Sequence, residues 1–348
     1  METVFLMLLA FVPITLGAQL AGIAPAYLFF LSAFAIVPLA KYIGEATEEL
    51  AARSSPAIGG LLNATFGNAT ELIIGVLGLS AGLIEVVKAS ITGSIIGNLL
   101  LVLGFSMFLG GWRREKQTFN RTAMLASASA LFLAVIALVM PALFSSTVPD
   151  AAPNVVESLS VLVSLVLLIV YAAGLWFSLR THKHLYLEEV GKYEARWGVA
   201  RALTVLTAAT LSVAVMSDIL VNSIRPLVSD LGWTQLFIGV IFVAIVGNAA
   251  EHVSALTTAR KNRMDLSLQI SIGSATQISM FVAPLLVLAS VLVGQPMSLV
   301  FNAFELAAMV LSVVIVYFVI ADGESNWLEG AQLLAAYAIM AAAFFFHP

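Results

Sequence analysis

The chain has 348 residues, of which 61% are hydrophobic and only 10% are charged. Because an ordinary soluble domain is roughly one quarter charged, this composition indicates an integral membrane protein, whose main partner is the lipid bilayer. The absence of cysteine excludes disulfides, thiolate metal sites and cysteine nucleophiles, and a net charge of −4 without a basic run gives no reason to expect nucleic acid as a partner.

Eleven stretches are long and apolar enough to cross a bilayer, which takes about 20 mainly apolar residues in a helix. The first stretch lacks the positively charged start and small-residue cleavage site of a secretory signal, so we expect it to remain as a membrane span. The sequence therefore predicts an all-α membrane protein with about eleven transmembrane helices. The predicted spans are 3–19, 24–43, 57–83, 88–110, 121–140, 157–178, 203–224, 234–258, 267–293, 300–320 and 328–346.

Lysine and arginine fall almost entirely in alternate loops. With loops numbered from zero at the N-terminus, the even-numbered loops and their span ends hold fourteen of the 16 Lys and Arg residues. The odd-numbered loops hold only Lys88 and Arg225. The positive-inside rule therefore predicts a cytoplasmic N-terminus and a C-terminus outside.

Three connections carry distinctive residues. The acidic segment 44–56 is either a solvated helix end or a cytoplasmic mouth that captures cations. The mixed-charge segment 179–202 is predicted to be a cytoplasmic amphipathic linker helix, with a regulatory ion site as the alternative. The loop 322–327 is expected to face outward, where Ser325 or Asn326 caps the last helix and the adjacent tryptophan suits the membrane interface. The alternative for this loop is a role at the external mouth.

Two matching motifs lie inside apolar spans. Residues 67–71 read Gly-Asn-Ala-Thr-Glu, and residues 247–251 read Gly-Asn-Ala-Ala-Glu, at an offset of 180 (251 − 71). The same offset, without a gap, aligns other identical residues on both sides of the motif, and we infer two homologous halves. These residues are Ile58 with Ile238, Gly59 with Gly239, Ala64 with Ala244, and Gly93-Ser94 with Gly273-Ser274.

The two halves run in opposite directions through the membrane. Glu71 lies in the third predicted span and Glu251 in the eighth, and two spans whose numbers differ by an odd number, here five, are antiparallel. Such inverted repeats are typical of alternating-access transporters, whose sites lie near the bilayer midplane between the repeats. The predicted division is an extra N-terminal helix (1–22), a first five-helix repeat (23–178), the linker (179–202) and a second five-helix repeat (203–348).

Each half carries one glutamate inside an apolar span. An ionisable group at that depth is costly and marks a functional site by default. Asn68 lies three residues before Glu71, and Asn248 three residues before Glu251, so each pair shares one helix face. The preceding glycine weakens the helix, and a break there would free backbone carbonyls to line a cavity.

The next span of each half adds further oxygen atoms. Ser94 and Asn98 are i,i+4 neighbours in the fourth span, and Ser274 and Gln277 are i,i+3 neighbours in the ninth. Together with the two glutamates and two asparagines, they form the predicted cation- and proton-binding set. The alternative for Asn98 and Gln277 is a structural role, because polar side chains often join helices within membranes.

An all-oxygen site with two carboxylates suits a hard divalent cation. Calcium accepts many oxygen ligands in flexible geometry, magnesium gives up its waters reluctantly, and no histidine or thiolate cluster favours zinc or copper. Two carboxylates close together in a low-dielectric medium repel each other, so protons bind them when the cation leaves. We expect Glu71 and Glu251 to bind Ca²⁺ and protons in competition, without a cofactor. The alternative is that each glutamate is a structural hydrogen-bonding group.

Three further ionisable residues lie in or near the spans. His252 follows Glu251, about 100° around the helix, and is either a packed histidine or part of a proton path. Glu305 and Asp218 lie in or near the tenth and seventh spans. Each is either a proton-path group or a side chain that reaches the interface from a span end, and we favour the interface position.

The two motifs resemble the paired signatures of the calcium/proton exchangers, the cation/proton exchanger branch of the calcium/cation antiporter superfamily. The first is residues 59–73, Gly-Gly-Leu-Leu-Asn-Ala-Thr-Phe-Gly-Asn-Ala-Thr-Glu-Leu-Ile, and the second is residues 244–252, Ala-Ile-Val-Gly-Asn-Ala-Ala-Glu-His. The resemblance covers essentially the whole chain, including 44–48 (Gly-Glu-Ala-Thr-Glu) and 273–277 (Gly-Ser-Ala-Thr-Gln).

This resemblance implies an eleven-helix fold in which Glu71 and Glu251 are the essential cation and proton sites, surrounded by the other residues of the set. It also implies a proton-related or conformational role for His252. A prokaryotic protein of the cytoplasmic membrane, exporting Ca²⁺ as protons enter, is expected. The alternatives are a related exchanger coupled to Na⁺ or K⁺ and a cation channel. Transport of other divalent cations and assembly into a homo-oligomer stay open.

Overall fold

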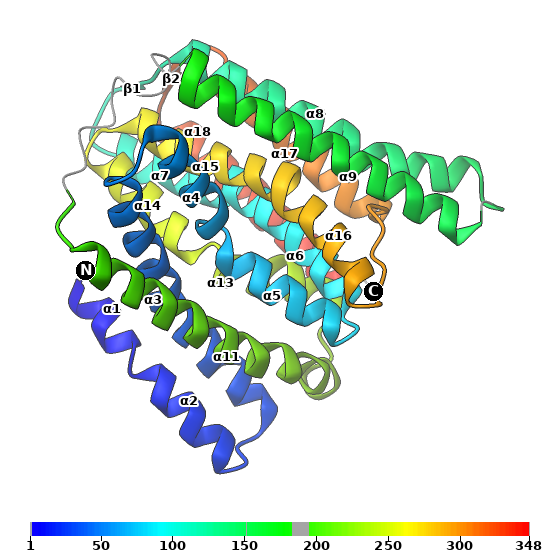
Figure 1. Cartoon of the computed structure of the whole chain (residues 1–348). Helices are drawn as coiled ribbons and strands as arrows, with labels where there is room; N and C mark the ends of the chain where they lie inside the picture. The colour runs from blue at the N-terminus through cyan, green and yellow to red at the C-terminus, as the bar shows by residue number, and fades with distance from the viewer. Residues whose placement is uncertain (1, 151, 183–194, 348) are drawn as a thin grey trace. The chain divides into compact units, whose positions relative to one another are not determined.

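The computed structural model describes residues 2–150, 152–182 and 195–347, and these are overwhelmingly helical (Figure 1). Half of the predicted linker helix at 179–202, residues 183–194, lies outside the described residues. The elements, in chain order, are α1 (Glu2–Leu8), α2 (Phe11–Leu20), α3 (Pro25–Ala51), α4 (Pro56–Phe66), α5 (Ala69–Ser80), α6 (Ile84–Ile96), the π-helical η1 (Gly97–Val102), α7 (Leu103–Gly111), β1 (Gln117–Thr118), α8 (Arg121–Thr147), α9 (Pro153–Trp176), the π-helical η2 (Phe177–Thr181), α11 (Val199–Leu231), α12 (Gln235–Phe237), the π-helical η3 (Ile238–Val243), α13 (Ala244–Gly247), α14 (Ala249–Arg260), α15 (Met264–Gln277), the π-helical η4 (Ile278–Val282), α16 (Ala283–Leu292), α17 (Ala303–Ile320), β2 (Glu324–Ser325) and α18 (Trp327–Phe346).

The number of spans agrees with the sequence prediction. Within the described residues, nine continuous helical segments are long and apolar enough to cross a membrane. Two more pass the same test as pairs of helical segments joined at a bend, α4 with α5 and Gln235–Gly247 (α12, η3 and α13) with α14, which brings the total to 11 if each pair is one span. An all-α membrane fold is thereby confirmed.

Local sequence explains where several helices begin and end. Proline occupies the first helical position at Pro25 and Pro153, where its fixed φ suits a helix and its missing N–H is not needed. Asn120 caps α8 by accepting a hydrogen bond from the Ala123 N–H. Gly232 follows α11 with φ of 67°, a left-handed conformation that glycine adopts without steric cost.

The described chain forms two compact units, and each combines segments of both predicted repeats. The first unit comprises Met1–Ser90, Lys192–Ala250 and His347–Pro348. The second comprises Ile91–Gly191 and Glu251–Phe346. The two compact units therefore do not coincide with the two sequence repeats. Within each unit, helices of one repeat pack against helices of the other.

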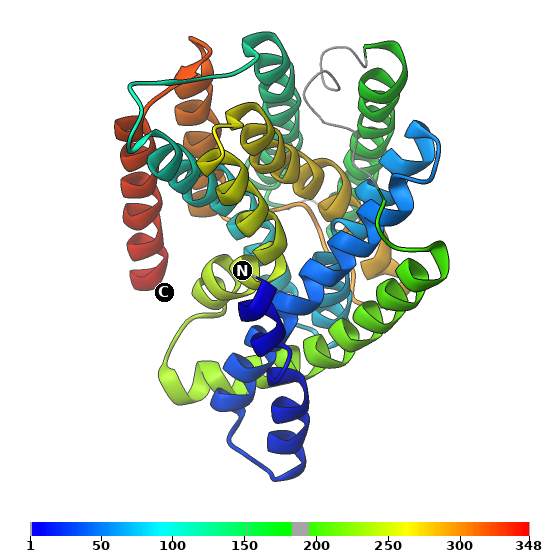
Figure 2. The same ribbon diagram turned by 90° about the vertical axis from the view of Figure 1, so that its left-hand side faces the viewer.

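The core of the first unit lies between the long helices α3 and α11, which run side by side (Figure 1). On α3 the fully buried residues Phe29 and Ile36 are seven positions apart, and on α11 Val213, Leu220 and Leu227 continue the same spacing. A seven-residue apolar repeat keeps one stripe of a helix against its neighbour over many turns. The helices α1 and α2 pack against α3 (Figure 2).

The second unit holds its helices together partly through glycine. Helices α8 and α9 lie side by side, and α7 packs closely on α18 (Figure 1). A Cβ atom placed on Gly104 of α7 would lie 3.1 Å from the carbonyl oxygen of Gly330 on α18. Small residues on facing helices let backbones approach closely, a common means of association within membranes.

The loop 322–327 requires a correction to the sequence prediction. Strand β2 of this loop pairs antiparallel with β1, with Gln117 opposite Ser325 and Thr118 opposite Glu324. The two loops therefore lie on the same side of the membrane, and the expectation that 322–327 faces away from the basic loop 112–120 is wrong. Lys116 Nζ lies 2.6 Å from Glu324 Oε1, and this hydrogen bond raises the pKa of Lys116.

The cap of the last helix is confirmed for asparagine. Asn326 Oδ1 accepts hydrogen bonds from the N–H groups of Leu328 and Glu329, at 3.0 and 3.1 Å. In return, the Glu329 carboxylate accepts a hydrogen bond from the Asn326 N–H at 3.0 Å. This reciprocal arrangement is a capping box, which satisfies helix N–H groups that have no partner within the helix.

The pairing of the two loops can be tested with single cysteines, since the chain has none of its own. We expect Glu115→Cys and Asp322→Cys to react with a membrane-impermeant thiol reagent from the same side of sealed vesicles. Gln295→Cys, at the opposite end of α17, should react only from the other side and serves as the control. Labelling of Asp322→Cys together with Gln295→Cys would contradict the observed pairing.

Candidate functional site

Both predicted helix breaks are present, at equivalent asparagines. Helix α4 gives way to α5 at Asn68, with φ −107° and ψ 19°, and α13 gives way to α14 at Asn248, with φ −95° and ψ 15°. The two pairs of helices are bent by 44° and 62°, respectively. Gly67 is needed at the first break because a Cβ atom there would collide with the carbonyl oxygen of Asn63.

The side chains of both asparagines bind back to the preceding helix. Asn68 Nδ2 donates to the Ala64 carbonyl at 3.1 Å, and Asn248 Nδ2 donates to the Ala244 carbonyl at 2.9 Å. Both asparagines are buried. The amide supplies a hydrogen bond to a carbonyl at the point where the helix bends, which is needed at a depth where no lipid can supply one.

Each glutamate is the third residue of the helix that follows a break. Glu71 lies in the first turn of α5, and Glu251 in the first turn of α14. The N-terminal end of a helix carries a partial positive charge, which favours a carboxylate there. In both repeats, the dipole of the following helix therefore favours the ionised form of a carboxylate that lies inside an apolar span.

The same Asn-Xaa-Xaa-Glu spacing has a different use at the span ends. At Asn302 and Glu305, the two side chains and backbone N–H groups form a reciprocal capping box. At Asn68, in contrast, the side chain makes no capping hydrogen bond and turns back to the preceding helix. The first intramembrane motif is thus not an ordinary helix cap, although its spacing is that of a capping box.

The second motif lies against the glutamate of the first. A Cβ atom placed on Gly247 would lie 3.2 Å from Cγ and 3.8 Å from Oε1 of Glu71. Both residues belong to the first compact unit. The backbone at the second break therefore lies directly beside the Glu71 side chain. Glycine at position 247 allows this contact because it has no side chain of its own.

In the second unit, the structure joins predicted residues of the fourth and ninth spans. Asn98 Nδ2 donates to Ser274 Oγ at 2.9 Å and to the Ser94 carbonyl at 3.0 Å. All three residues are buried, at 0%, 6% and 5% exposure, respectively. Gln277 lies one turn beyond Ser274 at the end of α15 and is half-buried.

Two π-helical segments occupy equivalent places in the two repeats. Segment η1 spans Gly97–Val102, and η4 spans Ile278–Val282, which matches the second to sixth residues of η1 at the offset of 180. Such segments are frequent at functional sites because the added residue changes the direction of nearby side chains. Asn98 lies within η1 and Gln277 directly precedes η4. The repeat symmetry thus extends to an unusual backbone conformation.

One carboxylate oxygen of Glu251 indicates that this residue binds a cation or a proton. Its Oε2 atom is buried and has no hydrogen-bond partner among the described residues. Burying a carboxylate oxygen without a partner is costly, and binding of a cation or a proton removes that cost. No group of three or more Asp, Glu or His side chains is gathered for metal binding in the described part of the chain. A cation would therefore also need amide, hydroxyl or backbone oxygens.

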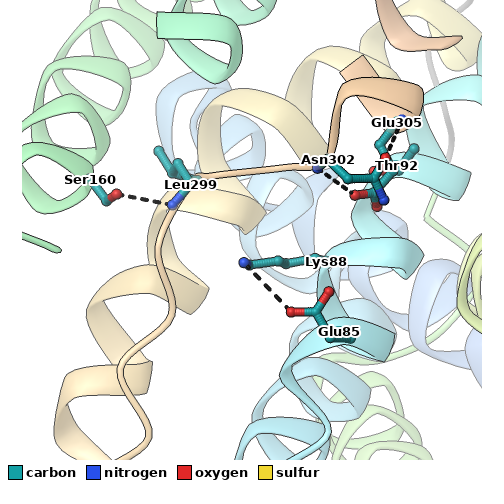
Figure 3. A network of polar contacts seen from close by, with 7 residues as sticks. All are labelled: Glu85, Lys88, Thr92, Ser160, Leu299, Asn302 and Glu305. Atoms are coloured by element: carbon teal, nitrogen blue, oxygen red, sulfur yellow. Dashed lines mark hydrogen bonds and ion pairs between the residues drawn. The ribbon is translucent and has the colours of Figure 1, made fainter. Parts of the chain in front are cut away.

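Glu305 is a buried residue whose position the sequence analysis missed. Its exposure is 2%, so the favoured interface position is wrong. Figure 3 shows the Glu305 carboxylate accepting hydrogen bonds from the Asn302 N–H at 3.1 Å and from Thr92 Oγ1 at 3.0 Å. The Asn-Xaa-Xaa-Glu spacing was the available signal for the first contact. Nothing local in the sequence indicates the second, between α17 and α6.

Paired broken spans, each with a carboxylate at the break, define a membrane transporter for ions built from an inverted repeat. The sequence profile of the sodium/calcium exchanger proteins matches residues 24–180 and 201–346. The chain belongs to this family, as the resemblance of its two motifs implied.

Characterised relatives are similar over their full length. The Ca²⁺/H⁺ antiporter of Aphanothece halophytica is 47% identical, covering 100% of this chain and 97% of that protein. The Ca²⁺/H⁺ antiporter ChaA of Bacillus subtilis is 45% identical, covering 98% of both chains. The solved structure of native YfkE is 43% identical, covers 99% of this chain and 100% of that chain, and superposes with a TM-score of 0.87.

Because Gly247 contacts Glu71, we predict that Gly247→Ala lowers the free energy of unfolding. The added methyl group would press on Glu71, and overpacking of this kind costs about 1–3 kcal/mol. We expect a lower melting temperature for the purified variant. Gly273→Ala is the matched control, because a Cβ atom there meets nothing within 4 Å. Equal melting temperatures for the two variants would contradict the tight contact at Glu71.

Proposed function

We propose that this protein exchanges Ca²⁺ for protons across a membrane by alternating access. The observation that carries the proposal is the placement of Glu71 and Glu251 at the same position after two equivalent helix breaks. The full-length relatives named as Ca²⁺/H⁺ antiporters support the choice of ions. The protein is a transporter rather than an enzyme, and Ca²⁺ and protons are its substrates.

In the proposed cycle, the two glutamates bind Ca²⁺ when both are ionised and bind protons when the cation leaves. Ionisation is favoured at the helix N-termini, whereas burial in the membrane favours the neutral form. Occupancy by one ion therefore opposes occupancy by the other, and this competition couples the two fluxes. We propose that Asn68, Asn248, Ser94, Asn98 and Ser274 complete the cation- and proton-binding set, and that their hydrogen bonds also hold the surrounding helices in place.

Two further predicted residues, Gln277 of the set and His252, have proposed supporting roles. Gln277 lies between Ser274 and the π-helical η4, and we assign it to the ion-binding set. His252 directly follows Glu251 on α14, and we assign it to the proton path. Since the basic loops mark the cytoplasmic side, we propose a cytoplasmic N-terminus and an external C-terminus, with the protein exporting Ca²⁺.

The proposal predicts that both carboxylates are needed for coupled transport. In proteoliposomes with an imposed pH gradient, wild-type protein should drive Ca²⁺ flux that follows the gradient and carries protons in exchange. Replacing a metal-binding carboxylate by an amide removes charge while keeping shape, so Glu71→Gln and Glu251→Gln should each lose Ca²⁺ flux by at least about tenfold. Glu85→Gln is the control, because the Glu85 side chain is 71% exposed.

Other outcomes separate the competing functions. Flux that ignores pH but requires Na⁺ or K⁺ would identify a different coupling ion on the same fold. Passive flux whatever the ion gradient would favour a channel. Normal transport by either glutamine variant, with the control also normal, would show that the two carboxylates do not share the cation and would refute the proposed mechanism.

A further inference from the structure

A basic pocket lies where two helices of the second unit end. Helix α7 ends at Gly111 and α14 ends at Arg260, and residues at their ends line an open cavity of about 510 Å³. Among the described residues, three guanidinium groups and no carboxylate line this cavity. The lining residues are Leu109, Trp112, Arg113, Arg114 and Arg260.

Arg114, one of the three arginines that line the pocket, is held by the helix ends. Arg114 Nη1 donates to the Gly110 carbonyl, and Nη2 donates to the Arg260 carbonyl at 3.3 Å. Both carbonyls belong to the last turn of a helix, where a cation is favoured. Arg114 thus ties α7 to α14, and the site gains a positive charge with a fixed orientation.

Arg113 and Arg260, the other two arginines of the pocket, differ from Arg114 in their contacts. Arg113 and Arg260 are exposed, and none of the three arginines forms an ion pair with a carboxylate among the described residues. Three neighbouring like charges repel one another, and an anion between them relieves that repulsion. Guanidinium groups bind phosphate well because their N–H groups match its oxygens in pairs.

Aromatic residues fix the depth of this pocket in the membrane. Trp112 is 61% exposed, and its ring lies 5.1 Å from that of Phe108 and 6.1 Å from that of Trp327. Trp327 is itself 44% exposed. Exposed tryptophans at the ends of membrane spans lie at the level of lipid headgroups. The arginines are therefore at headgroup height, beside the bilayer.

An apolar stripe leads from near the start of α7 to the arginines. Phe105, Leu109 and Trp112 are spaced i, i+4 and i+7, so they share one face of the helix. Their exposures are 40%, 41% and 61%. A lipid acyl chain can lie along such a stripe while its headgroup reaches the pocket, an arrangement that a dissolved anion cannot exploit.

We propose that this pocket binds the phosphate of an anionic phospholipid headgroup, with Arg113 and Arg260 as its main cationic contacts and the stripe of α7 beneath the acyl chain. Basic pockets on the cytoplasmic side of membrane helices commonly bind anionic lipids. The inference concerns the membrane class of the protein alone and does not depend on which ions it transports.

The test compares lipids on the purified full-length protein in detergent by native mass spectrometry. We expect wild-type protein to retain phosphatidylglycerol in preference to phosphatidylcholine. Each basic side chain near the surface contributes about fivefold to the affinity for anionic lipid. Arg113→Gln and Arg260→Gln should therefore each lower retention about fivefold, and the double variant about 25-fold.

Arg180→Gln is the matched control. Arg180 is exposed, lies over the Trp176 ring at 5.6 Å and belongs to the same unit, but it does not line the pocket. This variant should retain phosphatidylglycerol like the wild type. Equal retention of both lipids by wild-type protein, or full retention by the double variant, would overturn the proposal.

A second arm uses inorganic phosphate as the probe, measured by calorimetry on lipid-free protein. Phosphate should bind far more weakly than phosphatidylglycerol, because it makes no contact with the stripe of α7. Phosphate binding as tight as that of phosphatidylglycerol, and lost in the double variant, would instead assign the pocket to a dissolved phosphate and overturn the lipid assignment.

Discussion

The constraint on which this structure depends is that polar groups within a bilayer must find partners in the protein. A carboxylate and an interrupted helix are both costly there, and this chain places the two together twice. The asparagine at each break binds a carbonyl of the preceding helix, and the glutamate occupies the positive end of the next. Each helix break removes backbone hydrogen bonds, but it also creates a new helix N-terminus. The dipole of that new helix favours the negative charge of the glutamate.

One local pattern has two outcomes in this protein. The spacing Asn-Xaa-Xaa-Glu closes a capping box at Asn302 and Asn326, where helices begin at the span ends. At Asn68 the preceding residues are already helical, so the side chain binds the carbonyl four residues earlier. What precedes the motif decides its use: a capping box needs a chain that enters the helix from a loop, whereas a break within a span offers a helix on both sides.

The two repeats are alike in sequence but differ in structure. The π-helical segments η1 and η4 and the breaks at Asn68 and Asn248 occur at matching positions. Segment η3, in contrast, matches residues 58–63, which are α-helical. The bends of 44° and 62° also differ. Homologous halves in unequal conformations are what an alternating-access mechanism uses, since exchanging the two conformations reverses access.

The sequence by itself determined the membrane class, the spans, the repeat and the positions of both breaks, because hydrophobic length and residue identity act locally. The tertiary structure decided which residues meet. It placed Gly247 beside Glu71, Asn98 on Ser274, Thr92 on Glu305, and the loop 322–327 against β1, reversing its expected side. These contacts join segments far apart in the chain, so they depend on how helices pack, which no local pattern encodes.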